Sequence, residues 1–159
     1  MTTLELGLDG RAPAGWSVSH GEGPRIDTYL GFTRDIDAGQ AIMSRIEVSV
    51  LKVSDATTSL EMLAYERRAT QHAHHDVRLR RAEFISEIDP EIYGHEIRFE
   101  TELGPHDRIA VVQSEILFTF VGFKTRVLSF LLTAPEYAFD ECLPDFKALF
   151  DSINVQESE

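Results

Sequence analysis

Hydrophobic residues that alternate with polar ones predict four short strands in the first third of the chain. Successive side chains of a strand point to opposite sides, so this alternation indicates strands with one buried face. Glycine and proline cluster before residue 40, and we therefore expect loops between the first three strands. The predicted strands cover 4–8, 16–18, 29–32 and 42–50.

A helix is predicted after the fourth strand. Thr58-x-x-Glu61 has the form of a capping box, in which a hydroxyl and a carboxylate bind the unpaired backbone N–H groups of a helix start. Apolar residues continue from Leu60 to Tyr65, and we expect the helix to fade near His74.

Two long strands follow this helix in the predicted order. Over 77–88 the apolar parity shifts at Arg80-Arg81, which indicates a β-bulge. Over 93–102 the apolar residues Ile97 and Phe99 point to one side, and charged residues point to the other.

The strongest pattern is a hairpin over 108–133 that turns at Val121-Gly122 and is apolar on both faces. If Phe120 pairs with Phe123, one face carries Gln113 and Glu115 among six apolar residues, which are Ile109, Val111, Leu117, Leu128, Phe130 and Leu132. A hairpin that is apolar on both faces must be covered twice. Two interpretations are open: two helices cover it from opposite sides, or one face binds a ligand or a second copy.

The last segment predicts a second main helix. Apolar residues recur at helical spacing from Phe139 to Ile153. Proline suits the first position of a helix, so we expect this helix to begin near Pro144. The element order predicts an α+β fold, with a mostly antiparallel sheet of six to seven strands and two main helices.

Length and charge limit the function classes. The 159 residues suit a single domain, which we expect over 1–155 with a short acidic tail over 156–159. The net charge of −12 opposes binding to nucleic acid or to an anionic membrane surface. The chain has no run of about 18 apolar residues and no signal-like start, so we expect a cytoplasmic protein without a membrane span. The arginines over 67–81 are expected to face neighbouring carboxylates.

The residues offer little that points to catalysis or metal binding. There is no glycine-rich phosphate motif, no G-x-S-x-G and no H-E-x-x-H. The sequence His72-Ala-His74-His75 with Asp76 is the most metal-like feature, but we interpret it as a solvated helix end. The single cysteine, Cys142, lies among apolar residues and is expected to be buried and inert. We therefore expect no enzyme, no cofactor and no metal.

The chain resembles PsbP-like and DcrB-like proteins along most of its length. Their last strand ends in a Thr-Ala-Pro like 133–135, and the helix that follows ends in a pair like Ser152-Ile153. Pro13-Ala-Gly-Trp16 is similar to their opening, Ser59-Leu60-Glu61 to their first helix start, and Tyr93-Gly94-His95 to a glycine turn before their fifth strand. The resemblance implies an α/β/α sandwich without enzymatic activity. Members include photosystem subunits, a Ran-binding import factor, LpqN-type lipoproteins and Eag-type secretion chaperones.

The leading hypothesis is a non-enzymatic binding module, a chaperone or adaptor that holds an apolar protein segment in a secretion pathway. Its surface would be one hairpin face, exposed in the monomer and able to bind a protein partner or a second copy as a homodimer. The candidate partner-binding residues are Val111, Leu117, Leu128, Phe130 and Leu132. The alternative is a small-molecule carrier with an apolar pocket between the sheet and the first helix, and an enzyme ranks third.

Overall fold

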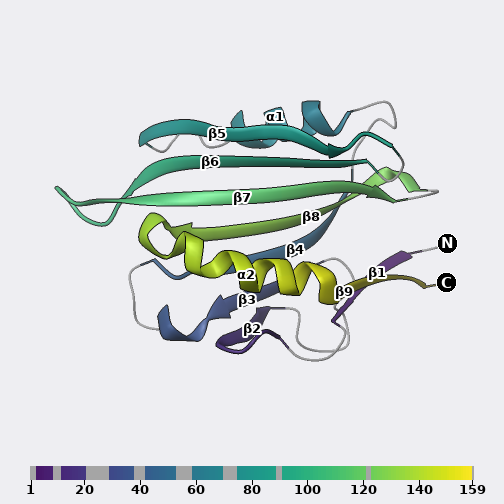
Figure 1. Ribbon diagram of the computed structural model, residues 1–159, viewed down its shortest axis with the longest axis horizontal. Coiled ribbons are helices and arrows are strands. Elements are labelled where there is room, and N and C mark those ends of the chain that lie inside the picture. The colour runs from purple at the N-terminus through teal and green to yellow at the C-terminus, as the bar shows by residue number, and fades with distance from the viewer. Residues whose placement is uncertain are drawn as a thin grey trace.

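A seven-stranded antiparallel sheet forms the centre of the molecule (Figure 1). Its strand order is β2-β3-β4-β8-β7-β6-β5. The computed structural model describes residues 3–8, 12–20, 29–37, 42–52, 59–69, 75–88, 91–120 and 123–158. The strands of the sheet are β2 (Trp16–His20), β3 (Tyr29–Arg34), β4 (Arg45–Lys52), β5 (His75–Ser86), β6 (Ile92–Glu102), β7 (Arg108–Phe120) and β8 (Phe123–Pro135).

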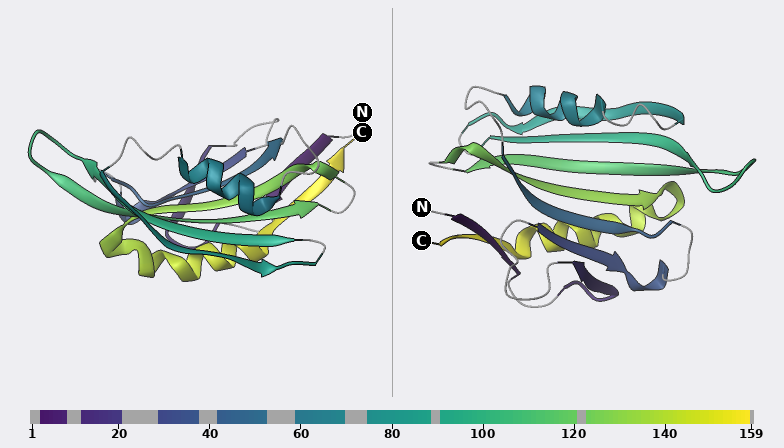
Figure 2. Two further views of the ribbon diagram at one scale, coloured as in Figure 1. Left: turned by 90° about the horizontal axis from the view of Figure 1, so that it is seen from above. Right: turned by 180° about the vertical axis from the view of Figure 1, so that it is seen from behind.

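Two helices lie on opposite faces of this sheet, α1 (Leu60–Ala69) on one and α2 (Glu136–Ser152) on the other (Figure 2, left). The larger core is on the α2 face, where Phe32, Phe130 and Leu149 are buried in one cluster. A smaller cluster on the α1 face joins Leu60 and Ala64 to strand residues. The predicted α+β sandwich with two main helices is therefore confirmed, and the two helices contact the hairpin from opposite sides.

The register of the β7–β8 hairpin differs from the expected one. Phe120 pairs with Phe123, as expected, but the next pair is Thr119 with Val127. Three residues of β8, 124–126, therefore lie between these two register pairs. Because side chains alternate between faces, an offset by an odd number exchanges the two faces of β8.

This offset decides which hairpin residues share a face. Phe118 pairs with Leu128 and Ile116 pairs with Phe130, so the even-numbered residues of both strands point toward α2. Leu117 lies in the cluster under α1. The expectation that Val111 and Leu117 share a face with Leu128, Phe130 and Leu132 is wrong.

Helix α1 begins one residue later than expected from a capping box with Thr58 as the N-cap. Ser59 is the N-cap, because its Oγ accepts a hydrogen bond from the backbone N–H of Met62 at 3.1 Å. Thr58 and the expected end of the helix at His74 lie outside the described residues. The helix ends at Ala69 within the described part of the chain.

Helix α2 begins at Glu136, directly after β8, and Pro144 lies inside it. The expected start near Pro144 is wrong. The proline lies on the exposed side of the helix together with Asp140, whose carbonyl it deprives of an N–H partner. The buried stripe consists of Ala138, Phe139, Cys142, Phe146 and Leu149.

Replacing Pro144 with alanine should raise the free energy of unfolding by about 1–3 kcal/mol, because alanine restores the missing backbone N–H in an exposed helix interior. Chemical denaturation measures the change. Pro105→Ala is the matched control, since Pro105 lies in the exposed turn between β6 and β7. Equal effects of the two substitutions would contradict this account of α2.

The edge strand β5 contains the predicted bulge, with a register shift between Leu79 and Arg81. The expected pairing of its arginines with carboxylates is confirmed: Arg80 binds Glu96 at 3.2 Å, and Arg81 lies 3.7 Å from Glu83. Gly94, expected in a turn, lies inside β6 opposite Glu83.

The two ends of the described chain pair with each other. Strand β9 (Ile153–Ser158) runs antiparallel to β1 (Thr3–Leu8) in a separate two-stranded sheet (Figure 1). Residues 156–158, expected to be part of an acidic tail, therefore lie in a strand, and Ile153 does not belong to the α2 stripe. This pairing joins sequence positions that no local pattern connects.

None of the helices in the described residues is long and apolar enough to cross a lipid bilayer.

Candidate functional site

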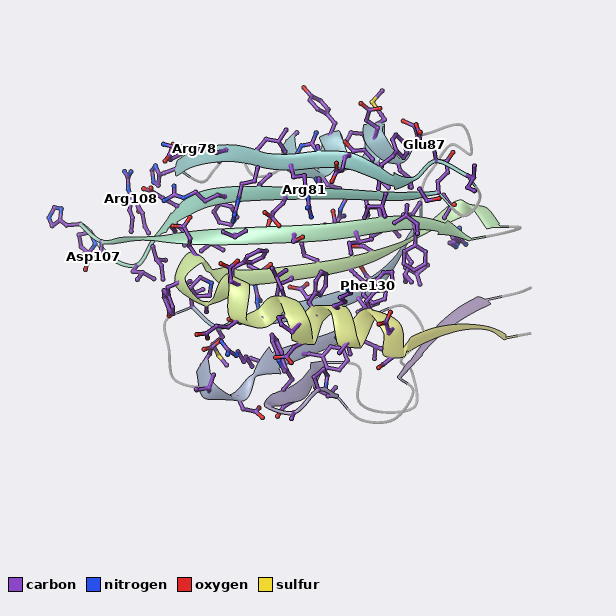
Figure 3. The ribbon with its side chains drawn as sticks, in the orientation of Figure 1. Arg78, Arg81, Glu87, Asp107, Arg108 and Phe130 are labelled. Carbon is purple, nitrogen blue, oxygen red and sulfur yellow. The ribbon has the colours of Figure 1, made fainter. Side chains whose placement is uncertain are left out.

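The five residues expected to form a partner-binding face are all buried. Leu128, Phe130 and Leu132 belong to the core under α2 (Figure 3 labels Phe130). Phe130 stacks on Phe118 and contacts Phe150. Leu117 lies under α1 and Val111 packs in a third cluster on that face. Their exposed fractions are at most 2%, so the expectation that they are exposed in the monomer is wrong.

Helix α1 leaves part of its own face of the sheet uncovered. Its buried residues Leu60 and Ala64 contact one end of the face, around Leu117 and Val127. The helix has only ten residues, so it is shorter than the strands beneath it. Figure 2 shows the helix over one portion of the curved sheet. The remaining portion carries a mixture of apolar and polar side chains.

Two cavities lie on this uncovered portion and share Gln113 in their walls. We call them together the α1-side groove. The larger cavity has a volume of about 450 Å³ and is lined by Ile42, Met43, Arg45, Phe99, Thr101, Val111, Gln113 and Thr133. The smaller has a volume of about 130 Å³ and is lined by Arg67, Arg68, His95, Ile97, Gln113, Glu115 and Leu131.

A buried carboxylate, Glu115 of β7, forms the floor of the smaller cavity. Arg67 from α1 donates to both carboxylate oxygens, with Nε at 2.8 Å from Oε1 and 2.9 Å from Oε2. His95 of β6 donates from Nε2 to Oε1 at 2.7 Å, and Ser129 of β8 donates from Oγ to Oε2 at 2.6 Å. Four elements therefore meet at this one side chain.

These contacts determine the charge state of Glu115. Burial by itself would raise its pKa, but the hydrogen bonds from His95 and Arg67, the positive charge of Arg67 and the bond from Ser129 together lower it to about 2. The carboxylate is therefore ionised at neutral pH, and both of its oxygens are occupied by donors. It is an anchor for α1 and is poorly suited to accept a proton from a substrate.

His95 connects this carboxylate to a second arginine. Nη1 of Arg68 lies 3.0 Å from Nδ1 of His95. A guanidinium can only donate, so Nδ1 must accept, and the hydrogen of the neutral imidazole is then on Nε2, which faces Glu115. The three residues form a chain of hydrogen bonds from Arg68 through His95 to Glu115 that fixes the imidazole and one side of the Arg68 guanidinium.

The polar side chains in the walls of the groove are those of arginine, histidine, glutamine, glutamate and threonine. In the described part of the chain, no cysteine or serine lines either cavity. Among the described residues no three histidine, cysteine or acidic side chains are grouped as a metal site. His75 pairs with Glu102 at 3.0 Å on the surface, while His72 and His74 lie outside the described residues. Cys142 is buried, as expected, and burial raises its pKa.

The sequence pattern did not identify Arg67, Arg68, His95, Glu115 and Ser129 as members of one site. One signal was available: Gln113 and Glu115 interrupt an otherwise apolar strand. A carboxylate that precedes Ile116 and Leu117 in a strand covered on both faces is expected to be buried, and a buried carboxylate needs donors. That signal indicates the existence of partners but not their identity.

Comparison with solved structures places this chain among proteins with a PsbP-like fold. PsbP (CyanoP) from Synechocystis sp. PCC 6803 has a TM-score of 0.56 at 18% identity, over 97% of this chain and 93% of that chain. LpqN from Mycobacterium tuberculosis, involved in cell envelope biogenesis, has a TM-score of 0.57 at 9% identity, over 98% and 84%. The Saccharomyces cerevisiae Ran-binding protein Mog1p has a TM-score of 0.58 at 10% identity, over 89% and 86%.

No protein-family model and no curated protein matches the sequence. The similarity to the solved structures is therefore one of fold, as the resemblance in the sequence implied.

Proposed function

We propose that this protein is a non-enzymatic binding module and that the α1-side groove is its binding site for a small molecule. The observation that carries the proposal is the pair of adjoining cavities beside α1, the larger of about 450 Å³. That volume is in the range of small-molecule sites, and a few polar groups among apolar walls are typical of them. Phe99 and Val111 supply apolar wall, while Thr101 and Gln113 supply hydrogen-bonding groups.

The chemistry of the groove supports binding rather than catalysis. A general acid or base needs a proton that it can exchange near neutral pH. The carboxylate of Glu115 has a pKa of about 2 and its oxygens are held by three side chains. An activated nucleophile needs a hydroxyl, thiol or amine beside a base. The hydroxyls of Thr101 and Thr133 line the larger cavity, whereas His95 and Glu115 line the smaller one.

A chaperone or adaptor for an apolar protein segment is the second candidate. An exposed hairpin face does not support this candidate, because α2 covers Phe130 and Leu132. What favours it now is that Mog1p, which shares the fold, is described as a Ran-binding protein. Homodimer formation through the edge strand β5 is disfavoured by its three register shifts, since bulges disrupt strand addition.

Filling the larger cavity should abolish binding of a small apolar probe. Thr101 lines that cavity at the surface end of β6, so Thr101→Trp places a large ring where the ligand would lie. We expect the affinity for the neutral dye Nile red, followed by fluorescence titration, to fall by about tenfold or more.

The matched control is Ile36→Trp. Ile36 is 76% exposed and lines neither cavity, so its replacement adds the same ring elsewhere. Thermal melting confirms that both variants are folded. If the two variants bind the dye as the parent does, the dye site is not the groove and the proposal is wrong.

A further inference from the structure

We propose that the ligand of the α1-side groove is an amphiphilic anion, with a carboxylate or phosphate head bound by Arg68 and an apolar part in the larger cavity. The inference rests on the proposed function, because it takes the groove as the binding site. It adds the charge and polarity of the ligand, which follow from how two neighbouring arginines of α1 are used.

Arg67 and Arg68 line the same cavity but have different partners. The guanidinium of Arg67 is bound to Glu115, which is only 5% exposed in its side chain. Arg68 donates to the neutral ring nitrogen of His95, and it forms no ion pair with any carboxylate in the described part of the chain. The carboxylate of the smaller cavity is therefore balanced by Arg67, and the charge of Arg68 is left uncompensated there.

Arg68 has the geometry of an anion receptor. A guanidinium has five N–H groups in a fixed plane, and one nitrogen of Arg68 is used by His95. The remaining donors match the oxygens of a carboxylate or phosphate, which arginine binds in a two-point manner. His95 is a positioning residue in this arrangement, because it is itself held by the buried Glu115 and holds the guanidinium from one side.

The neighbouring cavity determines the rest of the ligand. Beyond Gln113, the wall includes the half-buried side chains of Ile42 and Met43, which would gain from an apolar partner, beside Phe99 and Val111, which are already buried. A small inorganic anion would leave this apolar wall in contact with water, and a neutral apolar molecule would leave Arg68 without a counter-charge. An anion with an apolar part satisfies both.

The overall charge of the protein makes this local pattern informative. The chain carries a net charge of −12, so most of its surface repels anions. Arginines nevertheless line both cavities, Arg45 in the larger one and Arg67 and Arg68 in the smaller one, and Glu115 is the sole acidic lining residue in the described part of the chain. The groove is therefore the place where an anionic ligand meets attraction rather than repulsion.

The test compares ligands that differ in the head group. Decanoate and decyl phosphate carry the anionic head, decanamide is a neutral analogue of decanoate, and inorganic phosphate lacks the apolar part. We expect calorimetric titration at neutral pH to show that the protein binds decanoate about 10- to 100-fold more tightly than decanamide, as expected for a charge-assisted hydrogen bond. A preference between decanoate and decyl phosphate then distinguishes the two head groups.

Arg68→Gln should remove this preference while leaving decanamide binding unchanged. Arg81→Gln is the matched control: it removes the same charge from β5 (Figure 3), where Arg81 is 61% exposed and lines neither cavity. Arg68→Lys keeps the charge but lacks the planar guanidinium. Its preference for decanoate over decanamide should therefore lie between those of the parent and Arg68→Gln. His95→Ala should lower the ratio of the two affinities, which a loss of stability alone would not change.

The outcomes separate this inference from the proposed function. If decanoate and decanamide bind equally well and Arg68→Gln changes neither, the groove is a binding site but the anion inference is wrong. If inorganic phosphate binds as tightly as decyl phosphate, the apolar part of the inference is wrong. If none of the amphiphiles binds, and Nile red does not bind either, the proposed function itself fails.

Discussion

Replacing Phe130 with serine should lower the free energy of unfolding by about 3–5 kcal/mol or more. Phe130 is 1% exposed, and its ring lies 5.8 Å from that of Phe118 and 4.7 Å from that of Phe150, measured between centroids. Removing a ring from such a site loses its burial and leaves a cavity, and serine adds a buried hydroxyl. Chemical denaturation measures the loss.

Tyr137→Ser is the matched control for this variant. It also removes an aromatic ring, but Tyr137 lies on the outer side of α2 and is 70% exposed, so its loss should have little effect. A Phe130→Ser protein that melts with the parent while changing its oligomeric state in sedimentation would mean that this face is an interaction surface, as the sequence analysis expected.

Replacing Glu115 with glutamine should cost about 3–5 kcal/mol. The substitution keeps the size of the side chain but removes the charge that balances Arg67 and one of the two acceptor oxygens. Removing one partner of a buried ion pair leaves the other without compensation, which is strongly destabilising. Glu83→Gln is the control, since Glu83 is exposed and 3.7 Å from Arg81, and exposed pairs contribute little.

The same carboxylate should make stability depend on pH in a definite window. In the folded protein its pKa is about 2, below its ordinary value of 4.5. The stabilisation is therefore complete above about pH 4.5 and is lost as the pH falls toward 2, with a full size of about 3 kcal/mol. The difference in free energy of unfolding between the parent and Glu115→Gln should shrink across this window. Parallel pH curves for the two proteins would contradict it.

Much of the fold was predictable because local pattern and local structure agree. The predicted strands, the bulge at Arg80-Arg81 and the need to cover the hairpin twice all appear in the structure. The start of α2 was predicted wrongly because of Pro144. A proline inside a helix leaves the carbonyl four residues earlier without an N–H partner, so Pro144 is tolerated best on the exposed side of α2. Its position in the sequence does not show which side of the helix faces water.

The candidate site could not be predicted to the same extent. The sequence indicated that Glu115 would need donors, but its partners lie 48, 20 and 14 positions away, in Arg67, His95 and Ser129. These separations have no periodicity that a local pattern could carry. The α1-side groove depends in addition on where a ten-residue helix stops over a longer sheet.

The sequence by itself determined the strands of the central sheet and the presence of two helices, because hydrophobic periodicity is a local property of the chain. Only the tertiary structure decided which residues share a face, since the three-residue offset at the start of β8 exchanges its two sides. It also decided that two adjacent arginines have different uses, because the ionised Glu115 lies under Arg67 and a neutral imidazole lies beside Arg68. The physical reason is that pairing between distant strands fixes electrostatic partners, and that pairing is a property of the whole sheet.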